Sequence, residues 1–494
     1  MARSMAFVAG LAAFLACGIA AGAQATAAAS PEVPAAPTAA AASAGPSRPT
    51  LTAGAEAGYI TGGEADYWNG PTGRTYLGLD YTTKYFDLIA DLSMYDNDKY
   101  APTTASVPGG HLGHMYFLMD NGGVVAHAGP LRFAAGRFQQ YDVIKSPYSL
   151  FVNSDGNSAF SMKLDYEDDV FFYESRWIEL NSRSDVSTST YPTGFPDRGA
   201  NLKVFGFKLA PGMRFGFQDA GVYTGRSFDA EYFLNPIPQY FIQYVKTVGG
   251  SPWSTGGNEN EIVGMFWDWK RDDGISLNAQ LLIDDFSVFG LGGTPDNPWK
   301  LAWTFGGRMK TKYGTFGLFQ AGATKYTFES VGNDYPYSYT YYPDSRFNNG
   351  SNYYAISIAD NAIGYRNGEN NLALLADWSK SVAGCDLYAS LEFLLAGTNG
   401  SNDPWLGQSY YPGGTELLDD PTVEKRVLAT VSASWPTGRW RFYGSVAGGF
   451  AVDPLASVAA PNNLPTGSYI YVAQAGQVQP LMQLTIGAAY TWDL

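Results

Sequence analysis

The chain has 494 residues, of which 45% are hydrophobic, 15% are aromatic and only 16% are charged, and its formal net charge is −15. This composition is too aromatic for a disordered chain, and 31 Lys and Arg against 46 Asp and Glu exclude the basic excess of a nucleic-acid-binding protein. The length exceeds the ~100–200 residues of a typical domain, so several domains are expected unless one large β architecture uses the whole chain.

The first 23 residues are predicted to be a signal peptide. Arg3 supplies the basic start, Ala6 to Ala21 form an apolar run too short to anchor in a bilayer, and small residues at 21–25 form cleavage patterns. The alternative is lipoprotein processing that acylates Cys17. If Cys17 is removed with the leader, Cys385 is the one cysteine left, and the exported protein has no internal disulfide.

Residues 24–49 are mostly Ala, Pro and Ser and are predicted to form a periplasmic linker. The composition changes after this linker, and residues 50–494 are predicted to form one domain. No run after the leader reaches the ~18 apolar residues of a transmembrane helix, and helical periodicity is nowhere sustained.

Apolar and polar residues alternate with period two over segments of about ten residues. In segment 86–94, one face carries Phe86, Leu88 and Leu92 while the other carries Asp87 and Asp91. Segments 275–283, 387–395 and 427–435 repeat the pattern. Soluble β-sandwiches also alternate, but their strands have ~5–6 residues, whereas ~9–11 residues are needed to cross a bilayer at a tilt.

Short and long connections alternate along this β-rich region. Tight turns are predicted near residues 82–84, 120–123, 167–169, 210–212, 270–274, 311–314, 380–384 and 435–438. Long loops are predicted at about 63–74, 96–110, 138–158, 181–200, 222–260, 284–300, 324–370, 397–424 and 451–480. The sequence therefore predicts an all-β, antiparallel barrel in the cell outer membrane, with about 18 strands (16 as the alternative), periplasmic turns and extracellular loops.

The last strand supports the same location. Leu484, Ile486, Tyr490 and Trp492 alternate with smaller or polar residues up to Leu494. This pattern resembles the C-terminal assembly signal of outer-membrane barrels, although that signal usually ends on Phe or Trp. The expected partners are therefore outer-membrane lipid and the outer-membrane assembly machinery, and nucleic acid is not expected.

No arrangement of residues suggests catalysis. The three histidines are His111, His114 and His127, and a three-residue spacing on a strand points His111 and His114 to opposite faces. The chain has no nucleophile elbow, no phosphate-binding loop and no cysteine cluster. We expect no enzyme, no cofactor and no metal site.

Segment 214–286 carries the most specific motifs. They are Tyr223 and Arg226, the run from Tyr232 to Pro236 with Asn235, the pair Glu259 and Asn260, Trp267-Asp268, and Leu281 to Phe286 with Asp284 and Asp285. In this order the motifs resemble the Wzi-type capsule-assembly family. The resemblance implies an eighteen-stranded outer-membrane barrel that acts as a lectin for capsular or exopolysaccharide. The family's helical periplasmic segment has no evident counterpart here.

Two features of this segment can also be interpreted from the residues alone. Pro236 and Pro238 prevent a regular ladder, and loop 222–260 is apolar, so it is expected to fold inward or over the mouth as a plug or lid. Asp284 and Asp285 lie where a strand meets an external loop. They either cap local backbone N–H groups or form a polar site at the barrel mouth.

Sugar contacts are expected from aromatic faces in the long loops. The candidate polysaccharide-binding residues are Tyr335, Tyr337, Tyr339, Tyr341, Trp405 and Tyr410. The negative charge favours neutral or calcium-bridged glycans. Two functions remain open: a surface anchor for capsular or exopolysaccharide, and an outer-membrane porin or substrate-selective channel.

Overall fold

A computed structural model describes residues 49–61, 70–96, 111–112, 115–154, 158–183, 196–247, 249–254, 259–285, 298–328, 363–399, 416–459 and 469–493. The predicted signal peptide and nearly all of the predicted linker lie outside these residues and stay predictions.

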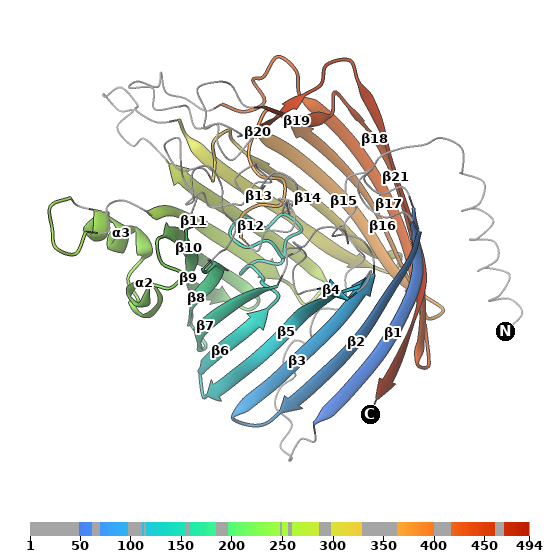
Figure 1. Ribbon diagram of the computed structural model, residues 1–494, viewed down its shortest axis with the longest axis horizontal. Coiled ribbons are helices and arrows are strands. Elements are labelled where there is room, and N and C mark those ends of the chain that lie inside the picture. The colour runs from blue at the N-terminus through green and yellow to red at the C-terminus, as the bar shows by residue number, and fades with distance from the viewer. Residues whose placement is uncertain are drawn as a thin grey trace, which may run out of the picture.

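The described residues form a closed antiparallel β-barrel of eighteen strands (Figure 1). The sheet closes because β1 (Thr50–Thr61) pairs with both β2 (Gly70–Thr82) and the final strand β21 (Val478–Asp493). A two-residue strand, β4 (His111–Leu112), adds to β5 (Met115–Ala128), and β19 (Leu455–Ala459) and β20 (Tyr469–Ala473) form a separate hairpin. The barrel strands are β1 (Thr50–Thr61), β2 (Gly70–Thr82), β3 (Phe86–Asp96), β5 (Met115–Ala128), β6 (Leu131–Phe138), β7 (Ala159–Glu167), β8 (Phe171–Asn181), β9 (Arg198–Ala210), β10 (Met213–Thr224), β11 (Glu259–Lys270), β12 (Ile275–Asp285), β13 (Lys300–Thr311), β14 (Gly314–Ala323), β15 (Asn371–Val382), β16 (Cys385–Ala396), β17 (Glu424–Thr437), β18 (Trp440–Val452) and β21 (Val478–Asp493).

The barrel strands are 8 to 16 residues long, and most reach the ~9–11 residues that cross a bilayer. Closure of the barrel gives every strand two neighbours, so that backbone N–H and C=O groups form the hydrogen bonds that hydrocarbon cannot provide. The predicted fold class, the strand number and the outer-membrane location are confirmed.

Side chains alternate between the lipid-facing wall and the interior, as the sequence pattern predicted. The outer wall exposes large apolar side chains, among them Leu92, Phe207, Leu277, Phe393, Val431 and Ile486. Polar partners face inward in the same strands: Arg74 of β2 donates to Ser93 of β3, and Asp87 of β3 lies 2.8 Å from His127 of β5. A wall with one apolar and one polar face is what lipid outside and water or protein inside require.

One predicted turn is wrong. Residues 120–123 lie inside β5, and the hairpin turn is at Gly129-Pro130, where Gly129 has φ of 63°. Asn121 pairs with Asp91 and Met119 with Leu92, so Asp120 forms a bulge. Asn and Gly favour bulges as well as turns, which is why the two could not be separated by composition.

Among the described residues, two helices interrupt the β architecture: α2 (Ala230–Leu234) and α3 (Gln239–Thr247), both in the connection between β10 and β11. Figure 1 places them beside β8–β11. No helix among the described residues is long and apolar enough to cross a membrane.

Candidate functional site

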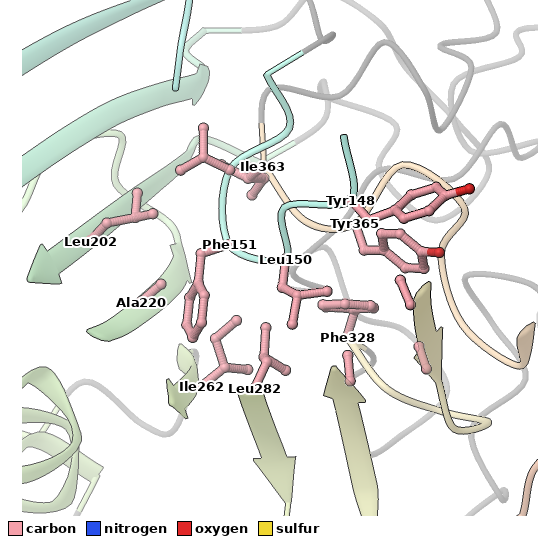
Figure 2. Close-up of a cluster of buried hydrophobic side chains, with 14 of the residues drawn as sticks. Tyr148, Leu150, Phe151, Leu202, Ala220, Ile262, Leu282, Phe328, Ile363 and Tyr365 are labelled. Atoms are coloured by element: carbon pink, nitrogen blue, oxygen red, sulfur yellow. The ribbon is translucent and has the colours of Figure 1, made fainter. Parts of the chain in front are cut away.

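The interior of the barrel holds a segment that we name the plug segment, residues 139–154, which connects β6 to β7. Leu150 and Phe151 are completely buried, and Figure 2 shows them among side chains that point inward from the strands. The inward residues in this apolar cluster include Leu202, Ala220, Val222, Ile262, Leu282, Ala302, Phe319, Ala373, Leu375 and Leu394. The plug segment is therefore bound to the inner wall from β9 to β16.

Asp142 organises the plug segment. Its carboxylate accepts the backbone N–H groups of Val143 at 2.7 Å, Phe151 at 3.1 Å and Val152 at 3.2 Å. It also accepts the side-chain amides of Gln218 at 3.0 Å and Gln280 at 3.1 Å. Burial raises the pKa of Asp142, although the hydrogen bonds from Gln218 and Gln280 oppose this shift. One carboxylate thus ties both ends of the segment's turn to β10 and β12.

The amides of the wall are themselves aligned. Gln280 donates to Gln218 at 2.9 Å, and its oxygen accepts the backbone N–H of Leu150 at 2.9 Å. Arg214 of β10 pairs with Asp268 of β11 at 2.6 Å and donates to the carbonyl of Val143 at 3.1 Å. Strand side chains therefore position the segment's backbone on two sides.

A second inner segment, residues 363–370, lies next to the plug segment. The backbone N–H of Gly364 donates to the carbonyl of Phe151 at 3.1 Å, and Val152 forms a β-bridge with Ile363. The Tyr148 hydroxyl donates to Glu392 of β16 at 2.6 Å. Burial, and then the negative charge of Glu392, raise the pKa of Tyr148, so its hydroxyl stays protonated.

Arg366 completes this arrangement. It donates to the same oxygen of Glu392 at 2.6 Å, and its guanidinium lies 4.9 Å from the ring centre of Tyr148. The two inner segments and β16 therefore meet at one carboxylate, where the tyrosine and the arginine compensate its burial.

The expectation that loop 222–260 is a plug or lid is wrong. Its helices lie on the outer wall, where Ser175 of β8 donates to the carbonyl of Phe233 at 2.6 Å and Lys203 of β9 donates to the carbonyls of Asn235 and Ile237 at 2.5 and 2.6 Å. Lys203 has the parity of the lipid-exposed Phe207, opposite to that of the inward Leu202. Apolar content alone did not indicate on which side of the wall the loop would pack.

Several motif residues meet on this outer wall. Arg226 pairs with Glu259 and, at 2.7 Å, with Asp229, and its guanidinium lies 4.5 Å from the ring centre of Tyr223. The Tyr232 hydroxyl donates to Glu259 at 2.5 Å. Tyr223, Arg226 and Glu259 thus hold the helices to the barrel.

The remaining motif residues do not join this cluster through their side chains. Asn235 and Pro236 lie in the link between α2 and α3, where the Asn235 carbonyl binds Lys203. Asn260 pairs with the inward-facing Val222. Asp284 accepts the backbone N–H of Phe328 at 2.8 Å.

The sequence left two interpretations of Asp284 open: a cap for local backbone N–H groups, or a polar site at the barrel mouth. Its side chain is 1% exposed and lies 3.9 Å from Lys300. It binds a backbone N–H group, as the capping interpretation expected, but in a segment distant in sequence. Asp285 ends β12, where the register shifts against β13.

All six candidate sugar-contacting aromatic residues lie outside the described residues: Tyr335, Tyr337, Tyr339, Tyr341, Trp405 and Tyr410. They stay predictions. Sequence reasoning missed the plug segment, although Tyr148, Leu150, Phe151 and Val152 make loop 138–158 conspicuously apolar for a connection in water. That run was the available signal.

The carboxylate of Asp453 at the extracellular rim forms a hydrogen bond and an ion pair whose strength is expected to depend on pH; we name this pair of contacts the Asp453 tie. Asp453, between β18 and β19, accepts the backbone N–H of Gly476 at 2.7 Å and pairs with Lys425 at 3.0 Å. The Gly476 hydrogen bond, and then Lys425, lower the pKa of Asp453. A lowered folded-state pKa stabilises the fold above the ordinary value of about 3.9, and this contribution is lost as the pH falls below it.

We therefore expect faster hydrogen exchange at the Gly476 amide, after correction for the intrinsic rate, when the pH is lowered from 6 to 3. Asp453→Asn keeps an acceptor oxygen but does not titrate, so its corrected exchange rate at Gly476 should be the same at both pH values. Asp169→Asn, in an exposed turn that the tie does not touch, should behave as the native chain does. Equal corrected protection of the native chain at pH 6 and 3 contradicts the assignment.

Comparison with known proteins identifies the fold of this chain but no family. No family model matches the chain, and no curated protein matches it in sequence. The structure is similar to Wzi of Escherichia coli, an outer-membrane protein involved in group 1 capsule assembly and a carbohydrate-binding β-barrel, with 11% identity, a TM-score of 0.51 and coverage of 91% of this chain and 85% of that chain.

Two further barrels match with lower scores. OccAB4 of Acinetobacter baumannii has 10% identity, a TM-score of 0.45 and coverage of 91% of this chain and 99% of that chain. OprD of Pseudomonas aeruginosa has 9% identity, a TM-score of 0.42 and coverage of 90% and 95%. At these identities the likeness is one of fold, and the chain is an outer-membrane β-barrel.

Proposed function

We propose that this barrel binds and anchors capsular or exopolysaccharide at the cell surface and is not an open channel. The observation that carries the proposal is the plug segment, which is held in the barrel by buried apolar side chains and by the hydrogen bonds of Asp142. The interior of an open diffusion channel is filled with water, whereas this segment occupies part of the interior. The motifs of segment 214–286 and the shared fold with a carbohydrate-binding barrel support the same function.

In this proposal, polymer binds to the extracellular loops and is not transported. Aromatic faces stack on the apolar faces of sugar rings, and side-chain amides and carboxylates bind the hydroxyls. The acidic net charge favours a neutral or calcium-bridged polymer. No step of the proposed function breaks a covalent bond, so the barrel acts as a lectin and not as an enzyme.

Simultaneous substitution of the six candidate aromatic residues by Ser is expected to lower the retention of purified surface polymer by cells that display the barrel. The six residues are Tyr335, Tyr337, Tyr339, Tyr341, Trp405 and Tyr410. Loss of stacking at ~0.5–1.5 kcal/mol per ring predicts at least a tenfold loss of affinity for the six rings together. Retention is measured with fluorescently labelled polymer. The control replaces the lipid-facing Phe207 and Phe393 with Leu, which leaves the loops unchanged.

Equal retention by cells with and without the barrel contradicts the anchoring function. Equal retention by the native and aromatic-depleted barrels assigns binding to other residues. Both outcomes are read after surface display has been matched by antibody labelling.

The second candidate function is a substrate-selective channel. Inward-facing ion pairs outside the plug favour it: Arg308 pairs with Asp377 at 2.7 Å and Arg441 lies 3.8 Å from Glu56. The two arginine side chains are 38% and 40% exposed. Paired charges are typical of the water-filled interior of porins. Conductance measurements separate the two functions.

A further inference from the structure

The helix α3 is amphipathic in the opposite sense to a helix in water. Its apolar side chains Tyr240, Phe241, Tyr244 and Val245 are 53–68% exposed and, at spacings of one and four residues, form one stripe. Its polar Gln239 is completely buried against the barrel, and Ile242 is the one apolar side chain of α3 that is buried beside it. In a water-exposed helix the apolar stripe packs inward, so the reversed pattern indicates an apolar surrounding for the outer face.

The helix places its polar groups against a polar patch on the barrel wall. Gln239 donates its backbone N–H to Asp219 of β10 at 2.5 Å and its side-chain amide to the carbonyl of Asn201 at 3.1 Å. Gln243 donates to the carbonyl of Glu259 at 3.1 Å. The one charged residue of α3, Lys246, is turned inward to Asp229 at 2.7 Å.

The wall beneath the helices carries polar groups that hydrocarbon would not tolerate. Lys203, Asp219 and Glu261 share the outward parity of the lipid-facing Phe207, Phe215 and Met265, yet all three charged residues are at most 6% exposed. The helical pair covers them. A charge on the lipid face of a barrel costs ~2–4 kcal/mol at the midplane, so this cover is needed wherever lipid reaches that height.

The height of the apolar belt argues that lipid does reach it. On β16 the outward apolar positions run from Leu387 to Leu395, and on β18 from Trp440 to Phe450. On β9 they run only from Phe205 to Leu209 before Lys203 follows. Five tilted residues span about 12 Å, roughly half of the ~25 Å apolar band of an outer-membrane barrel.

We infer that α2 and α3 are embedded in the outer leaflet of the outer membrane, where they replace the missing half of the lipid-facing belt on β8–β11. The exposed apolar side chains that make up the replacement surface are Leu234, Ile237, Tyr240, Phe241, Tyr244 and Val245. Tyrosine is favoured at the membrane interface, and β9–β11 expose the further apolar side chains Phe207, Phe215 and Met265 on the same outer face of the wall. The occupant of this surface is lipid. The inference does not depend on the proposed function.

Site-directed spin labelling tests the inference. Cys385 is replaced with Ser in the mature chain, residues 24–494, and a single cysteine is introduced by Phe241→Cys or Tyr244→Cys for nitroxide attachment in lipid vesicles. Collision with oxygen, which concentrates in lipid, is compared with collision with a water-soluble nickel complex. Both labels are expected to prefer oxygen, as the lipid control Phe207→Cys should.

The aqueous control is Asp169→Cys, an exposed position in the periplasmic turn between β7 and β8. A preference for nickel at positions 241 and 244, as at 169, overturns the inference and leaves the helices in water. Protection from both reagents also overturns it, because it assigns the surface to a protein partner or a second copy. A folded barrel is verified for each variant by heat-modifiable migration in gels.

Discussion

Replacing residues 141–153 with a Gly-Ser segment of the same length is expected to turn a closed barrel into a conducting one. An eighteen-stranded barrel is wide enough for a water-filled channel unless something fills it. The replacement removes Asp142, Tyr148, Leu150 and Phe151, and with them the contacts that hold the plug segment to β9–β16. Planar bilayers should show little conductance for the native chain and large, stepwise openings for the variant.

The matched control removes residues 228–246. These residues hold α2 and most of α3, which lie on the outer wall. Their removal also uncovers Lys203, Asp219 and Glu261, so conductance is compared only for barrels that heat-modifiable migration shows to be folded, and it is expected to stay low in them. If the native chain conducts as strongly as the plug variant, the closed-barrel proposal is wrong and the channel function is favoured. If only the 228–246 deletion opens the barrel, the plug segment has been assigned incorrectly.

Asp142→Ala is expected to loosen the plug segment without removing it. The substitution leaves the N–H groups of Phe151 and Val152 and the amides of Gln218 and Gln280 without their acceptor. Each unsatisfied buried group costs about 1–3 kcal/mol, so a total loss of about 3–5 kcal/mol is expected after relaxation. Hydrogen exchange at the Phe151 and Val152 amides should accelerate at least about a hundredfold.

Two controls define this effect. Asp142→Asn keeps one acceptor oxygen and should give an intermediate acceleration, and Asp169→Ala, in an exposed turn, should change exchange in the plug segment by less than about twofold. Unchanged exchange in Asp142→Ala means that the apolar contacts of Leu150 and Phe151 hold the segment alone. A single-channel record of the same variant should show brief openings.

The wall of the barrel was predictable because its signals are local. Period-two alternation identifies a strand such as Phe86–Asp96 from its own residues, and loop length separates periplasmic from extracellular connections. The misplaced turn at 120–123 shows the limit of local signals. Asn121 and Gly122 fit a hairpin equally well, and only pairing with β3 shows that a bulge is present.

The contents of the barrel were not predictable in the same way. Loops 138–158 and 222–260 are both long and apolar. The sequence indicates that the apolar side chains of each loop must pack against the barrel wall, but it does not indicate whether they pack on its inner or its outer face. The face is decided by the direction in which the polar side chains of the strands point. Gln218 and Gln280 face inward to Asp142, whereas Lys203 and Asp219 face outward to the helices. The motif residues Tyr223, Arg226 and Glu259 meet in the structure, but their place on the outer wall required the pairing of β9, β10 and β11.

The contacts of the plug segment have a consequence for the order of folding. Its partners Gln218, Gln280 and Glu392 lie 76, 138 and 244 residues away in the chain, all in strands that follow it. The plug segment therefore cannot complete its contacts before β16 has joined the sheet. The pairing of β1 with β21, which closes the wall, spans still more of the chain. Placement of the plug segment and closure of the wall therefore both depend on the C-terminal strands.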